Sequence, residues 1–431
     1  MGTSLGFHIV FAVLGVGLPT LMSVSEGLWL KTKDEVWLEL ARRWSKAFGI
    51  LFAVGAVSGT VLSFELGLLW PRFMAFSGAI FGLPFSAEAF AFFIEAIFLG
   101  LYLYGWDRLS PTAHWLASIP IAVSGAASSL FVVMANAWMN SPAGFRLTPA
   151  GHLLDVNPLA AALNPSTPTE DPHMLVSAYV VTGFLVAAVY AVGMLRRGAD
   201  QLHRRGLALG MAMGAVAIML AGITGDASAR FIYRGQPAKF AAMEGLYQSQ
   251  RGAPIHIGGI PLDSQHRVVY GIEIPKLLSV LATFDPNAEV RGLDSLPPDS
   301  RPNPILVHLS FDTMVGLGTL LGLLALLFWG LFIRARRRVP DRRLLLWAVA
   351  AAGPAAVVAM EAGWFVTEFG RQPWIVYGIL RTSQAATTAP ALGATFLIFL
   401  VIYAGLAITT GRLLLRLGGR NRQAAGRAGS R

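Results

Sequence analysis

Nine long apolar stretches run through this sequence of 431 residues and constrain its fold more than any other feature. An α-helix needs roughly 20 apolar residues to cross a bilayer core of about 30 Å. A spanning segment must satisfy its own backbone hydrogen bonds, and the alternation typical of barrel strands is not visible here. We therefore predict an all-α integral membrane protein with nine transmembrane helices. The predicted spans are 5–30, 44–66, 84–105, 112–135, 172–195, 204–225, 305–333, 344–367 and 389–411.

The composition agrees with a membrane protein and excludes several chemistries. Only 13% of the residues are charged, about half of the roughly 25% found in soluble domains. Cysteine is absent, which excludes disulfides, thiolate-bound iron–sulfur clusters, zinc fingers, covalent c-type haem and thiolate catalysis. A haem–copper oxidase requires a dense set of membrane histidines, and the eight histidines of this chain, none of them adjacent to another, do not fit that class.

The positive charge of the chain follows a membrane topology. There are 34 Lys and Arg residues against 24 Asp and Glu, a net charge of +10. Most of these cations lie in connections that are cytoplasmic if the N-terminus faces outside, whereas the short connections on the opposite side contain only Arg72, Arg146, Arg371 and Arg381. The positive-inside rule therefore predicts an outside N-terminus and an inside C-terminus. The excess charge does not indicate a nucleic-acid partner.

The connections divide the predicted protein into four segments. Residues 1–225 contain helices one to six, 305–417 contain helices seven to nine, and 418–431 form a cytoplasmic tail for which we predict disorder. Residues 226–304 form one long extracytoplasmic loop, in which 239–250 is expected to be a short amphipathic helix. A loop of this length in a compact membrane protein is usually functional or disordered.

Carboxyl side chains within the predicted spans mark candidate sites, because burying such a group in the membrane costs at least ~2.5–3.5 kcal/mol. Glu88 and Glu95 are seven residues apart, so on a helix they share one face at a separation of about 10 Å. This arrangement suits a proton path, or a metal ligand with its relay; a hydrogen-bonded pair between helices is the alternative. For Glu361, an interfacial carboxylate and a ligand are equally consistent with the sequence.

Two residues at the predicted outer ends of their helices, His173 and Met314, raise the possibility of haem ligation. A His/Met axial pair is one way to hold a low-spin haem, although Met314 alone is more simply a core side chain. His8 lies among apolar residues of the first span, where a lone histidine is more often a satisfied core residue. His114 and His308, near helix ends, are expected to be interfacial.

Five sequence blocks together resemble subunit I of the cytochrome bd-type quinol oxidases. They are FHIVFA at His8, AFFIEAIFLGLYLYGWDRL from Ala91, ANAWMNSPAGF from Ala135, KFAAMEGLY from Lys239 and EAGWFVTEFGRQPW from Glu361. The resemblance extends from residue 5 to about 411, and GRQPW in its EAGW context is the most specific part. The nine helices, the outside N-terminus and the long loop agree with that family. The length of the loop resembles its short-loop branch, which includes cyanide-insensitive oxidases.

The resemblance implies three haems and their ligands. His173 and Met314 would hold a low-spin haem b. His8 and Glu361 would each ligate one of two high-spin haems in the region of helices one to six, one of them a haem b and the third haem of type d or b. The resemblance does not say which of the two ligands belongs to which high-spin haem.

The same resemblance implies routes for protons and quinol. Glu88 and Glu95 would lie beside the high-spin haems as ligand or proton donor, and Asp107 would lie on the proton route from the inner side. Lys239 and Glu244 in the long loop would serve quinol oxidation.

The resemblance also implies an activity and its partners. The chain would be part of a terminal respiratory oxidase of the bacterial cytoplasmic membrane that oxidises quinol at the outer face and reduces O2 to water with cytoplasmic protons. A second membrane subunit, subunit II, and a small single-helix subunit would accompany it. Two other interpretations are a transporter or channel with a substrate-binding outer loop, and a haem-free subunit. The first does not explain GRQPW, and the second does not explain the occupied ligand positions.

Overall fold

The computed structural model describes residues 1–149, 151–389 and 392–428, with side chains as far as residue 418. Within this part of the chain, nine helices are long and apolar enough to cross a membrane, which confirms the predicted number. They are α1 (Gly2–Thr32), α2 (Glu35–Leu69), α3 (Pro71–Gly105), α4 (Pro111–Asn140), α6 (Thr167–Arg197), α7 (Gln201–Gly235), α10 (Pro304–Arg334), α11 (Arg343–Gly370) and α13 (Leu392–Ala428).

Several helices begin before their apolar stretches because polar residues cap them. Asp34 accepts a hydrogen bond from a backbone amide in the first turn of α2, and Asp200 does the same for α7. Asn303 caps α10 and is followed by Pro304, a residue that suits the first position of a helix. The predicted spans, which were limited to apolar residues, are therefore correct in order but too short at these ends.

Short elements fill the connections. The short helices are α5 (Pro158–Ala162), α8 (Pro237–Met243), α9 (Leu277–Thr283) and α12 (Thr382–Ala385), with the 3₁₀ turns η1 (Leu293–Ser295) and η2 (Pro298–Ser300). The antiparallel strand pairs are β1 (Arg146–Leu147) with β2 (Leu153–Leu154), β3 (Gln250–Arg251) with β8 (Glu289–Val290), β4 (Ile255–Ile257) with β7 (Ile272–Ile274), β5 (Ile260–Leu262) with β6 (Arg267–Val269), and β9 (Trp374–Val376) with β10 (Leu380–Arg381). Each strand has only two or three residues, so the pairs stabilise turns and build no core sheet.

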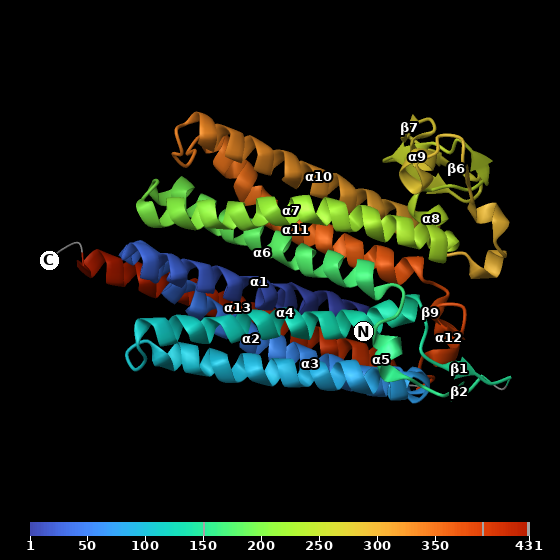
Figure 1. The fold of residues 1–431 in the computed structure, drawn as a ribbon, viewed down its shortest axis with the longest axis horizontal. Coiled ribbons are helices and arrows are strands. Elements are labelled where there is room, and N and C mark those ends of the chain that lie inside the picture. Colours follow the sequence, from blue (N-terminus) through green and yellow to red (C-terminus); the bar gives the residue numbers. More distant parts are fainter. Residues whose placement is uncertain (150, 390–391, 429–431) are drawn as a thin grey trace. The chain divides into compact units, whose positions relative to one another are not determined.

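The chain divides into two compact units. Unit 1 consists of the described residues of Met1–Met74, Ala87–Ser129 and Ala386–Arg431, and unit 2 of Ala75–Ser86 with the described residues of Leu130–Ala385. In unit 1, α1 packs along α2, and α13 contacts both helices. In unit 2, α6 and α10 each pack against α7 and α11 (Figure 1). These four helices therefore form a bundle, an arrangement whose interior can hold a cofactor between facing helices.

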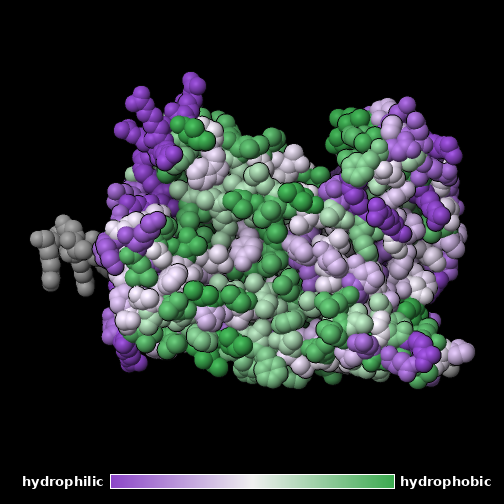
Figure 2. All heavy atoms as spheres, in the orientation of Figure 1, coloured by the Kyte–Doolittle hydropathy of each residue, from purple (hydrophilic) through white to green (hydrophobic). Residues whose placement is uncertain are grey.

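Large apolar side chains remain on the surfaces of the long helices. On α10, Leu320, Leu323 and Leu326 are all more than half exposed. Figure 2 shows hydrophobic residues along the middle of the visible helices and hydrophilic residues at the turn between α10 and α11. A band of this kind favours aggregation in water, whereas the hydrocarbon of a bilayer accommodates it.

The long connection between α7 and α10 is a folded segment. Because α7 continues to Gly235, the connection starts at Gln236 and not at residue 226. The helix expected at 239–250 is also shorter: α8 ends at Met243, and Gly245 then adopts a left-handed backbone conformation with φ 62°, which ends helices readily. Buried side chains from α8, α9 and β8 then pack into a small core of their own, formed by Phe240, Leu246, Ala253, Leu278, Ala282 and Val290.

The last helix enters the segment for which a disordered tail was predicted. α13 runs to Ala428, whereas the tail was expected to begin at residue 418. Residues 429–431 lie outside the described part of the chain. The disordered cytoplasmic tail stays a prediction.

Candidate functional site

His173 lies in the second turn of α6, and α7 fixes the orientation of its ring. The Nδ1 atom is 3.0 Å from the hydroxyl oxygen of Thr224. That hydroxyl donates its single proton to the carbonyl of Leu220, also 3.0 Å away. With the Thr224 proton on this carbonyl, the proton between the ring and Thr224 belongs to Nδ1. This tautomer leaves Nε2 unprotonated, with a lone pair available to a ligand.

His8 on α1 is held in the same way inside unit 1. Its Nδ1 is 2.8 Å from the hydroxyl oxygen of Ser58 on α2, and Ser58 donates its own proton to the carbonyl of Val54 at 2.9 Å. The same donor pattern would place the proton on Nδ1 and leave the lone pair on Nε2. Gly59 makes room for the ring, because a Cβ at that position would lie 3.1 Å from Cε1 of His8.

Met314 on α10 and Glu361 on α11 are the two further candidate ligands in unit 2. The sulfur of Met314 packs against Gly363, where an added Cβ would lie 2.9 Å from it. Glu361 is only partly buried, but its Oε1 atom is enclosed and has no hydrogen-bond partner among the described residues. An enclosed carboxylate oxygen without a donor is costly unless something satisfies it, and a cation is one such partner.

Glu88 and Glu95 both face α4, as their spacing predicts. Glu88 accepts a long hydrogen bond of 3.4 Å from Ser128 of α4. Glu95 is 5% exposed, and its Oε1 lies 3.2 Å from the point that a Cβ of Gly125 would occupy. Asp107 lies beyond the end of α3, in an exposed turn. The structure therefore places two buried carboxyls along one helix face and an exposed carboxyl at the end of that helix.

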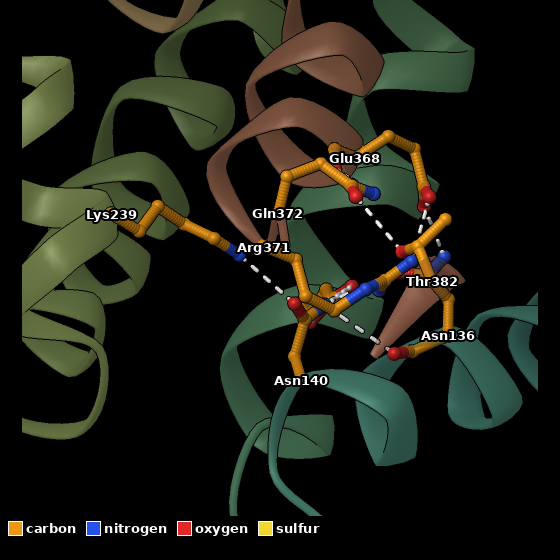
Figure 3. Close-up of polar contacts among 8 residues, drawn as sticks. Asn136, Asn140, Lys239, Glu368, Arg371, Gln372 and Thr382 are labelled. Carbon is orange, nitrogen blue, oxygen red and sulfur yellow. Dashed lines mark hydrogen bonds and ion pairs between the residues drawn. The ribbon is translucent and has the colours of Figure 1, made fainter. Parts of the chain in front are cut away.

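Lys239 is buried at the start of the long connection, with only 2% of its surface exposed. Its ammonium group donates to Asn140 Oδ1 at 2.9 Å, and Figure 3 shows the side chain reaching from α8 toward the end of α4. Asn140 Nδ2 donates in turn to the carboxylate of Glu170, at 3.1 and 3.2 Å. A single amide thus joins the lysine to a half-buried acid.

A second acid completes this network. Glu368 accepts a hydrogen bond of 2.8 Å from Asn136 and one of 2.6 Å from Arg371 (Figure 3). Arg371 is 1% exposed, and its Nε and Nη1 atoms have no partner among the described residues. Two buried cations and two acids therefore lie together, with donors on Arg371 still available to an acceptor such as a carboxylate.

The environment shifts the pKa values of the two candidate quinol residues in opposite directions. Burial lowers the pKa of Lys239, and the Arg371 cation lowers it further, against the opposing effect of Glu170. Burial raises the pKa of Glu244 to about 8, and the nearby carboxyl of Asp312 contributes to this increase. Both groups are therefore poised to exchange a proton closer to neutral pH than ordinary lysine and glutamate side chains.

Lys239 and Glu244 have different neighbours. Lys239 lies against Gly370, at the end of α11, as well as against Asn140. Glu244 ends α8, where its carbonyl accepts a hydrogen bond from His256 at 3.1 Å. Five residues along a helix correspond to a rotation of about 140° from one face, so the two side chains leave α8 in different directions.

His114 and His308, which are expected to be interfacial because they lie near helix ends, are both buried inside the protein. His308 is fully buried, and its Nδ1 donates to the carbonyl of Met243 at 2.7 Å. His114 is 2% exposed, and its Nε2 donates to the carbonyl of Tyr102 at 2.9 Å. Both rings satisfy backbone carbonyls of other elements, and this long-range pairing is not visible in the local sequence.

Comparison with known proteins identifies the family. The profile described as Cytochrome bd terminal oxidase subunit I matches residues 1–421. The chain belongs to this family. A Bacillus subtilis (strain 168) protein provisionally named cytochrome bd menaquinol oxidase subunit I is 38% identical over 96% of this chain and 94% of its own. The cytochrome bd ubiquinol oxidase subunit 1 of the same strain is 32% identical over 93% of this chain and 87% of its own.

A solved structure agrees with this assignment. The bd oxidase from Geobacillus thermodenitrificans matches with a TM-score of 0.92 and 37% identity, over 97% of this chain and 96% of that chain. This cytochrome bd subunit I is a multi-pass membrane protein of a quinol:O2 oxidoreductase, and its family implies haems, a quinol substrate and a complex with subunit II.

The residues present in this cytochrome bd subunit fit haem groups. His8 and His173 show the arrangement expected of metal-bound imidazoles, in which the second ring nitrogen donates to a fixed acceptor. The enclosed oxygen of Glu361 and the free donors of Arg371 fit an iron and a propionate, respectively. The fit rests on hydrogen bonds and burial within each unit.

Sequence reasoning missed several residues that surround these groups. Ser58 and Thr224 fix the histidine tautomers but lie in spans where hydroxyls are common. Asn140 was noticed only as part of the ANAWMN block, and Glu170 precedes its span by two residues, where an acid is unremarkable in a sequence. Asn140 follows the predicted span 112–135 by five residues, so the apolar pattern gave no signal for it.

Proposed function

We propose that this subunit oxidises quinol at the outer face of the bacterial cytoplasmic membrane and reduces O2 to water with protons from the cytoplasm. In this orientation the N-terminus lies outside and the C-terminus inside, as the distribution of Lys and Arg favours. One observation carries the proposal: His8 and His173, both in membrane-spanning helices, have Nδ1 bound to a hydroxyl and Nε2 left for a metal.

Four side chains hold the cofactors in this proposal. His173 and Met314 bind a low-spin haem b, and His8 and Glu361 each bind one of two high-spin haems, a haem b and a third haem of type d or b. When bound, the haems supply one-electron transfer and the binding of O2, while the protein supplies ligands and proton routes. The helix bundle of unit 2 supports the pairing of His173 with Met314, because their helices α6 and α10 both pack against α7 and α11.

The long connection, predicted as 226–304 and starting at Gln236 in the structure, is the quinol-binding part of the proposed enzyme. Glu244 accepts a proton from the quinol hydroxyl, since a pKa of about 8 places this base near working pH. Lys239 donates a hydrogen bond to a quinol oxygen. Hydrogen bonds from Lys239 to Asn140 and from Asn140 to Glu170 form the path by which charge leaves the quinol site. Quinol oxidation releases protons on the outer side.

Protons for water formation enter from the opposite side. Asp107 is exposed beyond α3, and Glu95 and Glu88 follow along the same helix in the direction of the membrane interior. Proton release outside and uptake inside separate charge across the membrane without a pump. The exposed apolar faces of the helices in 1–225 and 305–417 fit subunit II and a small single-helix subunit, and 418–431 is the cytoplasmic tail.

The proposal is tested on the holoenzyme purified with its partner subunits. His173→Ala is expected to lose the low-spin haem in a pyridine haemochrome assay and to stop quinol-driven O2 consumption. His152→Ala, which changes an exposed histidine in a connection, is the matched control. Unchanged haem content in the His173 variant would contradict the ligand assignment.

A further inference from the structure

Three polar side chains meet inside unit 1, close to the end of α3 from which Asp107 extends. Glu26 of α1 and Tyr102 of α3 have no exposed surface, and His114 of α4 is 2% exposed. Glu26 Oε1 lies 2.7 Å from Nδ1 of His114, and Glu26 Oε2 accepts a 2.6 Å hydrogen bond from the hydroxyl of Tyr102. An acid and an imidazole buried at membrane depth, outside the groups already assigned, require an explanation.

The hydrogen bonds fix how many protons this cluster holds. His114 Nε2 faces the carbonyl of Tyr102 at 2.9 Å, and because a carbonyl only accepts, Nε2 carries a proton. The remaining contact, between Nδ1 and Oε1, needs one more. That proton can reside on His114, giving an imidazolium beside a carboxylate, or on Glu26, giving two neutral groups. Both arrangements keep every hydrogen bond, so the proton can move along this 2.7 Å contact without a rearrangement.

The cluster continues the line of acids on α3. Tyr102 is seven residues beyond Glu95, just as Glu95 is seven beyond Glu88, so each step advances about 10 Å along nearly the same helix face. The partners on α4 run in the opposite direction over the same distance, because His114 contacts Tyr102 and Ser128 contacts Glu88. Water molecules are the carriers that would join Tyr102 to Glu95 across such an interval.

The other side of the cluster leads to the exposed turn. Trp106 covers the His114 ring with their centroids 3.9 Å apart, and the guanidinium of Arg42 on α2 lies 5.1 Å from the Trp106 ring. Of the charged and titratable groups here, Tyr102 bonds Glu26 directly, exposed Arg42 reaches the pair only through Trp106, and exposed Asp107 follows Trp106 in the chain. The covering tryptophan shields the pair from solvent while Asp107 remains outside it.

We propose that Glu26 and His114, positioned by Tyr102, are a proton-loading pair between Asp107 and Glu95 on the uptake route. A proton taken up at the inner side adds to Glu26 Oε2 as the Tyr102 hydroxyl turns from donor to acceptor, so the pair holds one proton beyond the one shared by Nδ1 and Oε1. Release of a proton toward Glu95 lets the Tyr102 hydroxyl turn back and restores the resting pair. No covalent bond other than those to the transferred protons forms or breaks. The inference rests on the proposed function, in which Asp107 and Glu95 conduct protons.

Glu26→Gln is the decisive variant, measured in the holoenzyme. A glutamine amide can donate to Nδ1 of a neutral His114, and its carbonyl can accept from Tyr102, so both hydrogen bonds are retained while the exchangeable proton is lost. Turnover with quinol is expected to fall by about 10²-fold, with an altered pH profile and solvent isotope effect. In infrared spectra, a carboxyl band that responds to turnover should disappear. Glu39→Gln, which removes a surface acid paired with Arg43, is the control.

The outcomes separate this inference from the proposed function. If the wild type oxidises quinol and Glu95→Gln is slow but Glu26→Gln is normal, the pair is structural and the inference fails alone. If the wild type lacks haem or O2 consumption, the proposed function fails. Should Glu26→Gln prove unstable, Tyr102→Phe, which removes only one hydroxyl, is expected to change the pH profile while leaving the haem spectrum unchanged. A Tyr102→Phe profile identical to wild type would overturn the relay.

Discussion

Two hydroxyl groups decide which nitrogen of each candidate haem ligand is available. The hydroxyls of Ser58 and Thr224 both lie within hydrogen-bonding distance of a carbonyl in their own helix, and a hydroxyl that donates there can only accept from the neighbouring imidazole. This pattern favours, for His8 and His173, the tautomer with a free Nε2. A hydroxyl that looks like an ordinary helix residue thus sets the chemistry of a ring on another helix.

Removing such a hydroxyl tests this role directly. In Thr224→Val the shape of the side chain is nearly retained, but His173 loses the acceptor of its Nδ1 proton. We expect binding of the low-spin haem to weaken by about 10- to 100-fold, measured by spectral titration of the haem-depleted protein. Thr60→Val is the control, since Thr60 is an exposed residue of α2 whose hydroxyl also bonds within its own helix. Equal haem binding in both variants would remove Thr224 from the site.

The raised pKa of Glu244 makes a prediction about pH. Its carboxyl has a pKa of about 8 in the folded protein, against an ordinary value of 4.5. As a base it works only when deprotonated, so quinol turnover should rise with pH through about 8, and Glu244→Gln should lose that rise. For stability the sign is opposite: between pH 4.5 and about 8 the folded state binds more protons than the unfolded state, so its stability falls as pH increases. A wild-type turnover profile flat across pH 8 would contradict this assignment.

At the scale of elements, glycines determine how closely α6 and α7 approach. A Cβ at Gly210 of α7 would lie 2.7 Å from the backbone nitrogen of Ala187 on α6. Backbone atoms cannot move aside as a flexible side chain can, so the two helices would have to separate. Gly222 lies further along α7 with open space where its Cβ would be.

These two glycines give a matched pair of substitutions. Gly210→Ala should lower the free energy of unfolding by about 1–3 kcal/mol through overpacking. Gly222→Ala should leave it unchanged or raise it by up to about 1 kcal/mol, because alanine favours the helix. Thermal unfolding of the two variants in the same detergent compares them. A more stable Gly210→Ala variant would show that α6 and α7 are not held by close backbone contact.

What could be predicted from the sequence depended on how local each feature is. The nine spans follow from apolar length alone, and a capping residue such as Asp34 explains the added turns. The early end of α8 depends on the backbone of Gly245, which a hydropathy pattern does not reveal. The Lys239–Asn140 bond joins residues 99 apart, and the His114–Glu26 contact joins residues 88 apart. Such pairs can be identified only from the fold, because the sequence around one partner contains no information about the other.

At the scale of the whole molecule, the charge distribution of the connections predicts which ends of the helices face the cytoplasm. The wild-type chain contains no cysteine, so each introduced thiol is unique. Ser264 is exposed in the long connection, and Gln201 is exposed at the start of α7. With the N-terminus outside, a membrane-impermeant thiol reagent should label Ser264→Cys in intact cells and Gln201→Cys only after permeabilisation.

The labelling distinguishes orientation from misfolding, because each variant is compared before and after permeabilisation of the same cells. Each substitution changes an uncharged surface residue, so the Lys and Arg distribution that sets the topology is unchanged. Quinol turnover of both variants should equal that of the wild type. Labelling of Gln201→Cys in intact cells, with Ser264→Cys protected, would place the long connection in the cytoplasm. Quinol oxidation at Lys239 and Glu244 would then release protons into the cytoplasm, and Asp107 would take protons up from outside. That result would contradict the proposed direction of charge separation.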